Sequence, residues 1–197
     1  MIRKDILICG VGGQGTVLAS KIIAAAAMAE GNTVHSAETI GMAQRGGPVT
    51  SHVRIGQEVF SPLIPRGSAE LMLAFEPAEA VRNLRYLRKD GLVILHTGEV
   101  RPVTESLRPS GYSGQVMTDY LRGKCACLPA DLEALSAPLG SARFHNILLI
   151  GLAAGAGRMG ISRESLIREI GNRVPEKYLE KNLEAFEIGF SFGKEHS

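Results

Sequence analysis

A short apolar strand pattern near the start of the chain leads directly into a glycine-rich turn and then into a long helical pattern. Ile6, Leu7 and Ile8 form the apolar run, residues 10–15 read GVGGQG, and residues 14–29 are rich in alanine. Strand, glycine turn and helix in this order are the setting that the G-x-G-x-x-G pattern requires. The segment therefore predicts a Rossmann-type first unit.

The glycines of this turn have distinct expected roles. We predict that Gly10 makes the tight turn out of the strand, that Gly12 lets a phosphate or another backbone approach, and that Gly15 lets the helix pack against the strand. The free N–H groups at the helix start favour an anion. An NAD site would also need a carboxylate about 20 residues further on, at the end of the second strand. That strand, residues 33–36, ends in Ser36, and Glu38 lies two residues beyond it.

The composition is that of one globular domain. The chain has 197 residues, 45% hydrophobic and 21% charged, so a substantial core is available. A formal charge of +2 and the lack of a basic stripe with interleaved aromatic residues predict no nucleic-acid partner. The opening MIRKD lacks a signal-peptide core, and the apolar stretch at 147–156 is too short to span a bilayer. We expect a cytoplasmic chain that has no membrane partner.

Strand and helix patterns alternate along the chain. Strands are expected at residues 6–9, 33–36, 49–55, 71–75, 92–95 and 124–128, and helices at 14–29, 77–87, 117–122, 131–137, 146–156, 162–170 and 175–190. Residues 37–48 and 97–114 are expected to be irregular, and Asp90-Gly91 to form a turn. We predict one α/β domain over residues 1–197, with a helical C-terminal part at 162–197. Its architecture is a three-layer, Rossmann-like, mostly parallel sheet with helices on both faces.

A second glycine-bearing segment follows the second expected strand. Residues 39–48 read TIGMAQRGGP, where Arg45 is a planar, permanently charged donor for phosphate or carboxylate. The alternative is a tight turn with Arg45 on the surface, and the spacing favours neither. In a doubly wound sheet this segment would lie at the carboxyl edge, near the first glycine turn. The candidate binding residues are Gly10, Gly12, Gly13, Gln14, Gly15, Thr16, Gln44, Arg45, Gly46 and Gly47.

The other reactive side chains form no recognisable catalytic or metal-binding pattern. Cys125 and Cys127 would share one face of a strand, but two thiolates do not complete a zinc site, and Cys9 is distant in sequence. The five histidines show no paired helical spacing. Among them, His96 stands at the end of an expected strand, where functional groups often lie. The sequence therefore predicts no metal site and identifies no catalytic residue.

Several segments resemble the gamma-type domain of 2-oxoacid:ferredoxin oxidoreductases. These are GVGGQG at 10–15, AQRGGPVTSHVR at 43–54, SPLIP at 61–65, GSAEL at 67–71 and FEPAEA at 75–80. The resemblance covers nearly the whole chain and is weakest at 97–114. Within the family, the small beta subunit of the indolepyruvate type is the most similar.

The resemblance implies a subunit rather than a complete enzyme. Such enzymes decarboxylate a 2-oxoacid on thiamine diphosphate, pass electrons through iron–sulfur clusters to ferredoxin, and release an acyl-CoA. It implies a larger alpha subunit as partner, carrying thiamine diphosphate and the clusters, with indolepyruvate or another arylpyruvate as substrate. Coenzyme A is then a possible shared ligand at the glycine residues, and this chain alone is expected to hold no cofactor.

Three other interpretations share parts of the first motif. A free-standing NAD-binding oxidoreductase needs a carboxylate at the ribose position, for which Ser36 is a poor fit. A ubiquitin-activating-like adenylyltransferase needs an acidic residue after the second strand and usually a reactive cysteine or zinc cysteines, and here only Arg45 offers a possible match. A non-catalytic Rossmann-type interaction module needs no ligand at the turn.

Overall fold

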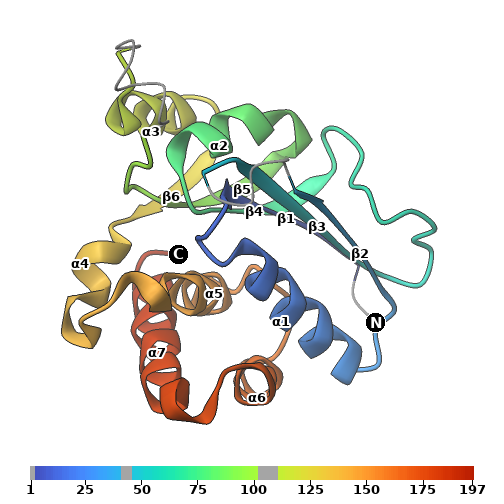
Figure 1. Cartoon of the computed structure of the whole chain (residues 1–197). Helices are drawn as coiled ribbons and strands as arrows, with labels where there is room; N and C mark the ends of the chain where they lie inside the picture. Colours follow the sequence, from blue (N-terminus) through green and yellow to red (C-terminus); the bar gives the residue numbers. More distant parts are fainter. Residues whose placement is uncertain (1–2, 41–45, 102–110) are drawn as a thin grey trace.

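The computed structural model describes residues 3–40, 46–101 and 111–197, in which a six-stranded sheet lies between two groups of helices (Figure 1). One face carries α2 (Pro77–Asn83) and α3 (Gly114–Arg122). The other carries α1 (Thr16–Ala29), α4 (Leu132–Ser136), α5 (His145–Gly155), α6 (Arg163–Arg173) and α7 (Leu179–Glu195). The predicted α/β class with helices on both faces is confirmed.

The sheet has one antiparallel strand inside an otherwise parallel arrangement. Its order is β2 (Val34–Ile40), β3 (Pro48–Ile55), β1 (Lys4–Val11), β4 (Ala69–Ala74), β5 (Leu87–His96), β6 (Ala126–Ala130). Strands β1, β4, β5 and β6 are parallel neighbours, whereas β3 is antiparallel to both β1 and β2. A short connection returns β3 directly beside β2, which only an antiparallel pair allows. The sheet is therefore mostly parallel, as predicted.

Several strands, β2 and β5 among them, are longer than the sequence indicates. β2 continues to Ile40 because β3 pairs with it along its whole length, from Val34 opposite Ile55 to Ile40 opposite Val49. β5 begins at Leu87 and passes through Asp90-Gly91, where we expected a turn. The pairing of β4 with β5 shifts register at this point, and a Cβ on Gly91 would lie 2.9 Å from the Ala69 carbonyl oxygen. Gly91 therefore permits a close strand approach rather than a chain reversal.

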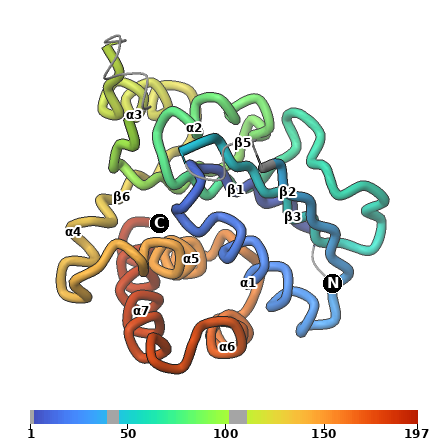
Figure 2. Tube along the Cα trace, in the orientation of Figure 1, coloured from blue at the N-terminus to red at the C-terminus, as the bar shows by residue number. Residues whose placement is uncertain are grey.

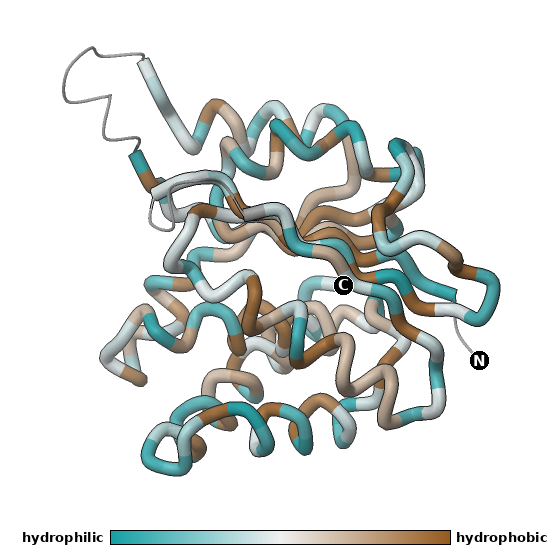
Figure 3. Tube along the Cα trace, turned by 45° about the vertical axis from the view of Figure 1, so that its right-hand side comes forward, coloured by the Kyte–Doolittle hydropathy of each residue, from teal (hydrophilic) through white to brown (hydrophobic). Residues whose placement is uncertain are grey.

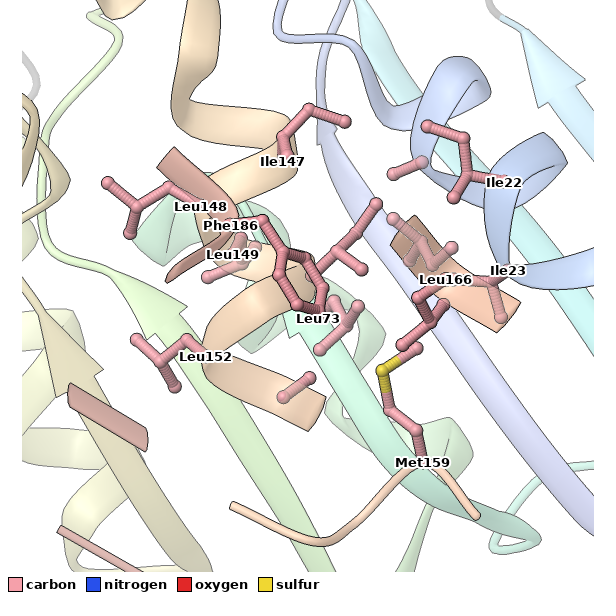
Figure 4. Packing of buried hydrophobic residues seen from close by; sticks show 14 of the residues in the cluster. Ile22, Ile23, Leu73, Ile147, Leu148, Leu149, Leu152, Met159, Leu166 and Phe186 are labelled. Carbon is pink, nitrogen blue, oxygen red and sulfur yellow. The ribbon is translucent and has the colours of Figure 1, made fainter. Parts of the chain in front are cut away.

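Buried apolar residues form one hydrophobic cluster on each side of the sheet. Figure 3 shows hydrophobic residues along the strands and on the helices that cover them. In the larger core, Ile22 and Ile23 of α1 and Phe186 of α7 lie around Leu73 of β4 (Figure 4). Every residue of α5 from His145 to Ala153 is buried. Contacts with α1, α4, α7 and β5 surround this helix, which explains why its sequence is apolar on all sides. In the described residues, no helix combines the length and apolarity needed to cross a bilayer.

Helices α5 and α7 cross so closely that four glycines form the contact. A Cβ added to Gly151 or Gly155 of α5 would lie well under 3.0 Å from a carbonyl oxygen of α7. The same holds for Gly189 and Gly193 of α7 against carbonyl oxygens of α5. Backbone therefore packs directly on backbone, and this contact fixes the last helix against the larger core.

The segment between β3 and β4 projects at the end of the sheet opposite the first glycine turn (Figure 2). Arg54 holds it there: Nη1 donates to the carbonyl oxygens of Ser61 and Leu63, at 3.0 and 3.3 Å. Nε and Nη2 of the same guanidinium donate to both carboxylate oxygens of Asp5, at 2.8 and 3.2 Å. Both residues of this ion pair are buried, on adjacent strands. The SPLIP segment is thus anchored by the sheet.

Candidate functional site

The first glycine segment forms the turn between β1 and α1, but its glycines act differently from our expectation. Gly10 lies inside β1, and the reversal occurs later, at Gly13 and Gly15, whose φ angles are +107° and +82°. A Cβ on Gly10 would lie 2.7 Å from Gln14 Oε1 and 2.8 Å from Phe75 Cβ. The expectation that Gly10 makes the turn is therefore wrong, because this residue instead gives the turn room to fold back on the strand.

The turn is also fastened to the neighbouring elements. Gln14 Oε1 accepts the Val11 amide at 2.6 Å, and its Nε2 donates to the Phe75 carbonyl at 2.9 Å, at the end of β4. A Cβ on Gly15 would lie 2.7 Å from Asn146 Nδ2, so this glycine permits packing against α5 rather than against the strand. Thr16 is the buried first residue of α1.

The second glycine segment lies beside the first, as its place after β2 predicts. The Gly12 amide donates to the Gly47 carbonyl at 2.8 Å, and the Gly46 amide to the Gly12 carbonyl at 3.4 Å. Gln44 and Arg45 lie outside the described residues. Gly12 and Gly46 use their N–H groups on each other's segments, and the Gln14 amide donates to the Val11 carbonyl at 3.1 Å. In the described part of the turn, the amides left for a ligand are those of Gly13, Gly15 and Thr16.

Two cavities open at the carboxyl edge of the sheet, near the first glycine turn. Here α1 and α2, which follow the adjacent parallel strands β1 and β4, leave toward opposite faces, and open α/β sheets bind ligands at such a switch point. The His96 cavity, of about 350 Å³, is lined by the Gly13–Gly15 turn, Phe75, His96, Gly98, Arg143 and Asn146, among others. The Glu76 cavity, of about 380 Å³, lies on the α2 side.

The Glu76 cavity is built around a buried carboxylate. Glu76 caps α2, its Oε2 accepting the Glu79 amide at 3.0 Å, and Tyr112 donates its hydroxyl to Oε1. Burial raises the pKa of Glu76. It also raises the pKa of Glu79, against the opposing effect of the Arg82 ion pair. Because each carboxylate has a hydrogen-bond partner, these groups explain how α2 begins without requiring a ligand.

Two histidines meet in the His96 cavity, although they are 49 residues apart in sequence. The rings of His96, at the end of β5, and His145, at the start of α5, pack edge to face with centroids 5.1 Å apart. Glu133 and Ser136 approach His145 Nε2, with Glu133 Oε2 at 3.9 Å and Ser136 Oγ at 2.8 Å. The position of His96 at the end of an expected strand marked it as a candidate functional residue. Nothing in the sequence spacing links His96 to His145 or Glu133. Only the tertiary fold brings them together.

Burial favours the neutral form of both imidazoles. Burial lowers the pKa of His96, and so does the neighbouring His145; burial also lowers the pKa of His145, against the opposing charges of Glu133 and Asp131. A third buried histidine, His52, likewise has a lowered pKa because of burial.

We expect stability to fall when the protein is acidified from about pH 7.5 to about pH 5.5. In the unfolded chain these histidines have their ordinary pKa of about 6.5, whereas in the folded chain their pKa is lower. Between the two pKa values the unfolded chain binds more protons than the folded chain, so stability falls as the pH falls through this range. Urea denaturation at both pH values measures the effect. His145→Gln should reduce it, while His196→Gln, at an exposed position, should not. Equal pH dependence in all three proteins would contradict the assignment.

Burial disfavours the thiolate form of all three cysteines. Burial raises the pKa of Cys9, Cys125 and Cys127, in the last case to about 11. All three are free thiols, and Cys9 is fully buried.

Glu38, the acidic residue after the second expected strand, accepts a hydrogen bond from Ser20 of α1 at 3.1 Å.

Comparison with known proteins assigns the chain to a family. Residues 5–192 match the family described as pyruvate ferredoxin/flavodoxin oxidoreductase. The chain belongs to this family. It is 37% identical over 192 residues to indolepyruvate oxidoreductase subunit IorB of Archaeoglobus fulgidus, covering 96% of this chain and 95% of that relative. With the subunit of the same name from Thermococcus kodakarensis it shares 34% identity over 200 residues, or 99% and 98% of the two chains. The resemblance expected from the sequence is confirmed.

Solved structures show the same fold. The keto/oxoacid ferredoxin oxidoreductase gamma subunit from Geobacter sulfurreducens PCA superposes with a TM-score of 0.72 at 22% identity, covering 98% of this chain and 99% of that one. A structure of 2-oxoglutarate:ferredoxin oxidoreductase from Magnetococcus marinus, with 2-oxoglutarate, coenzyme A and succinyl-CoA bound, gives 0.78 at 19% identity. It covers all of this chain but 32% of that chain. The fold therefore occurs both as nearly the whole of one solved chain and as part of a longer one.

Proposed function

We propose that this chain is the small, gamma-type subunit of a thiamine-diphosphate-dependent 2-oxoacid:ferredoxin oxidoreductase that acts in the cytoplasm on indolepyruvate or another arylpyruvate. The observation that carries the proposal is the identity of 37% and 34% to two IorB subunits, over at least 95% of each chain. The reaction is oxidative decarboxylation to an acyl-CoA, with ferredoxin accepting the electrons.

The residues of this chain do not fit an iron–sulfur cluster. Its three cysteines are one fewer than the four thiolates an ordinary cluster needs, and burial raises the pKa of each of them. We therefore assign the clusters and thiamine diphosphate to a larger alpha subunit. This chain contributes the rim formed by the two glycine segments, which faces that subunit and the path of coenzyme A.

Reconstitution with the larger subunit tests the proposal. Co-expressed and purified together, the two chains should reduce a viologen dye in the presence of coenzyme A and indolepyruvate, and each chain alone should not. Pyruvate and 2-oxoglutarate serve as alternative substrates in parallel assays. Turnover by the isolated chain would overturn the subunit assignment, whereas a complex that prefers pyruvate would overturn only the arylpyruvate assignment.

Arg45 provides the sharpest test of the glycine rim. If its guanidinium holds a phosphate of coenzyme A, Arg45→Ala should raise the KM for coenzyme A by about tenfold, the value of one charge-assisted hydrogen bond, and leave the KM for the 2-oxoacid nearly unchanged. Arg66→Ala is the matched control, because Arg66 is an exposed arginine in the segment that projects from the opposite end of the sheet. Equal effects of the two substitutions would count against the assignment.

A further inference from the structure

Two helices, α1 and α5, begin at the His96 cavity. Gly15 precedes α1 and Phe144 precedes α5; neither makes a side-chain capping bond, and neither helix has an acidic residue in its first turn. Helix α1, of 14 residues, presents the unpaired amides of its first turn and the positive end of its dipole. Helix α5, of 11 residues, adds its dipole but fewer free amides, because the His145 amide donates to the Ala142 carbonyl and the Ile147 amide to Asn146 Oδ1. Because both starts line one cavity, their fields add there.

His96 adds a fixed hydrogen-bond donor. Its side chain is buried, with 5% of the residue exposed, and its Nδ1 accepts the amides of Gly98 and Leu132, both at 3.3 Å. With Nδ1 acting as acceptor, the proton of the neutral ring stands on Nε2. The Ala130 carbonyl also lies beside the ring and favours its charged form. Within the described residues no hydrogen bond from Nε2 is seen, and the side chain lines the cavity. The ring therefore offers an N–H to whatever occupies the space.

Asn146 supplies a second buried donor. The residue is 7% exposed, and its Oδ1 accepts the Ile147 amide at 2.9 Å. This bond fixes the amide so that Nδ2, the donor end, is beside Gly15 at the glycine turn. Arg143, exposed at the cavity rim, has no carboxylate partner among the residues described. Donors therefore come from three sides of the cavity.

The same geometry argues against a metal ion at these histidines. Single ligand atoms of His96, Glu133 and His145 do lie within 4.8 Å of one another. However, a metal bound at His96 Nε2 would require a lone pair there, and the two amides pointing at Nδ1 place the proton on Nε2. The Ser136 hydroxyl donates to the Glu133 carbonyl at 3.4 Å, which leaves its oxygen to accept the Nε2 proton of His145. The cluster is thus arranged to donate protons in hydrogen bonds.

We propose that the His96 cavity binds a phosphate or pyrophosphate group through His96 Nε2–H, Asn146 Nδ2, Arg143 and the amides of Gly13, Gly15 and Thr16. The inference deepens the proposed function, and the identification of the phosphate as part of coenzyme A rests on that function. Two acidic residues line the cavity. Glu99 is occupied by the Gly114 amide and Arg101. Glu133 is exposed, makes no close ion pair and opposes an anion.

Titration of the full-length chain with inorganic pyrophosphate tests the proposal, with binding measured by calorimetry and by the ¹⁵N resonances of the histidine rings. We expect the free protein to show a proton on His96 Nε2, and pyrophosphate to shift that resonance. Arg143→Gln should weaken binding about tenfold. Arg158→Gln is the matched control, since Arg158 is exposed just beyond the opposite end of α5. It should change affinity by less than about twofold.

Glu133→Gln separates an anion site from a metal site. Removing this negative charge should tighten pyrophosphate binding, whereas it would weaken a metal ion that used Glu133 as a ligand. A Zn²⁺ titration of the same variants supplies the comparison. The proposal is overturned if pyrophosphate leaves His96 unshifted, if Arg143→Gln and Arg158→Gln have equal effects, or if Zn²⁺ binds at His96 and Glu133→Gln abolishes it.

Separate titrations with ADP and coenzyme A identify the source of the phosphate. Binding of coenzyme A that shifts His96 and is weakened by Arg143→Gln supports both the cavity and the proposed function. If pyrophosphate or ADP binds in this way and coenzyme A does not, the phosphate site stands and the role of coenzyme A fails. Conversely, an active two-subunit complex whose KM for coenzyme A is insensitive to Arg143→Gln leaves the proposed function standing and overturns the assignment of coenzyme A to this cavity.

Discussion

Gly189→Ala should lower the free energy of unfolding by about 3 kcal/mol or more, the upper range for overpacking a well-packed core. The added methyl group would lie well under 3.0 Å from the Leu148 carbonyl oxygen, and that oxygen belongs to backbone rather than to a side chain that can rotate away. Helices α5 and α7 must then separate. Their separation loosens the packing of Phe186 against the larger core.

Gly171→Ala is the control for that substitution. Gly171 lies in α6 with open space where its Cβ would stand, so alanine there should raise stability by about 0.5–1 kcal/mol through helix propensity and reduced unfolded-state entropy. Urea denaturation of both variants measures the difference. A Gly189→Ala protein as stable as Gly171→Ala would show that the two helices are not in backbone contact.

The glycine contact between α5 and α7 could be predicted from the sequence only in part. Gly151 and Gly155, like Gly189 and Gly193, have the four-residue spacing that places both glycines on one helix face. That pattern indicates a smooth face on each helix, but which two faces meet depends on how the chain returns after α6. The apolar composition of α5 predicted its burial, whereas its partner helix could be found only in the folded chain.

The candidate site, like the contact between α5 and α7, was predicted from the sequence only in part. The nearness of the two glycine segments followed from placing both at the carboxyl edge of a doubly wound sheet. The structure joins them through Gly12 and Gly47, where β3 begins beside the end of β1. The antiparallel course of β3 was not visible, because the alternating pattern of a strand carries no direction. His145 and Asn146 were missed because a buried polar residue at the start of an apolar helix looks the same in sequence whether it caps the helix or lines a cavity.

Arg54→Met should destabilise the protein by about 3–5 kcal/mol, the cost of leaving one charge of a buried pair without its partner. Asp5 is a residue of β1 that is 6% exposed, and its carboxylate would lose both of its hydrogen bonds from the guanidinium. Arg122→Met is the matched control. The Arg122 side chain is exposed, and its Nη1 lies 3.8 Å from Asp119 Oδ1, a long distance for an ion pair. Loss of this pair should cost about 0.5 kcal/mol or less. Denaturation curves of the two variants test the contrast.

The double variant Asp5→Leu/Arg54→Met separates the charge effect from the packing effect. With both charges removed no buried ion remains, so stability should recover by at least half of the loss seen in Arg54→Met. The carbonyls of Ser61 and Leu63 still lose their donor, and because these residues are exposed, water can replace it. Faster amide hydrogen exchange in residues 56–68 should therefore persist in the double variant after global stability returns. A double variant as unstable as Arg54→Met would mean that the guanidinium stabilises the fold by anchoring this segment rather than by neutralising Asp5.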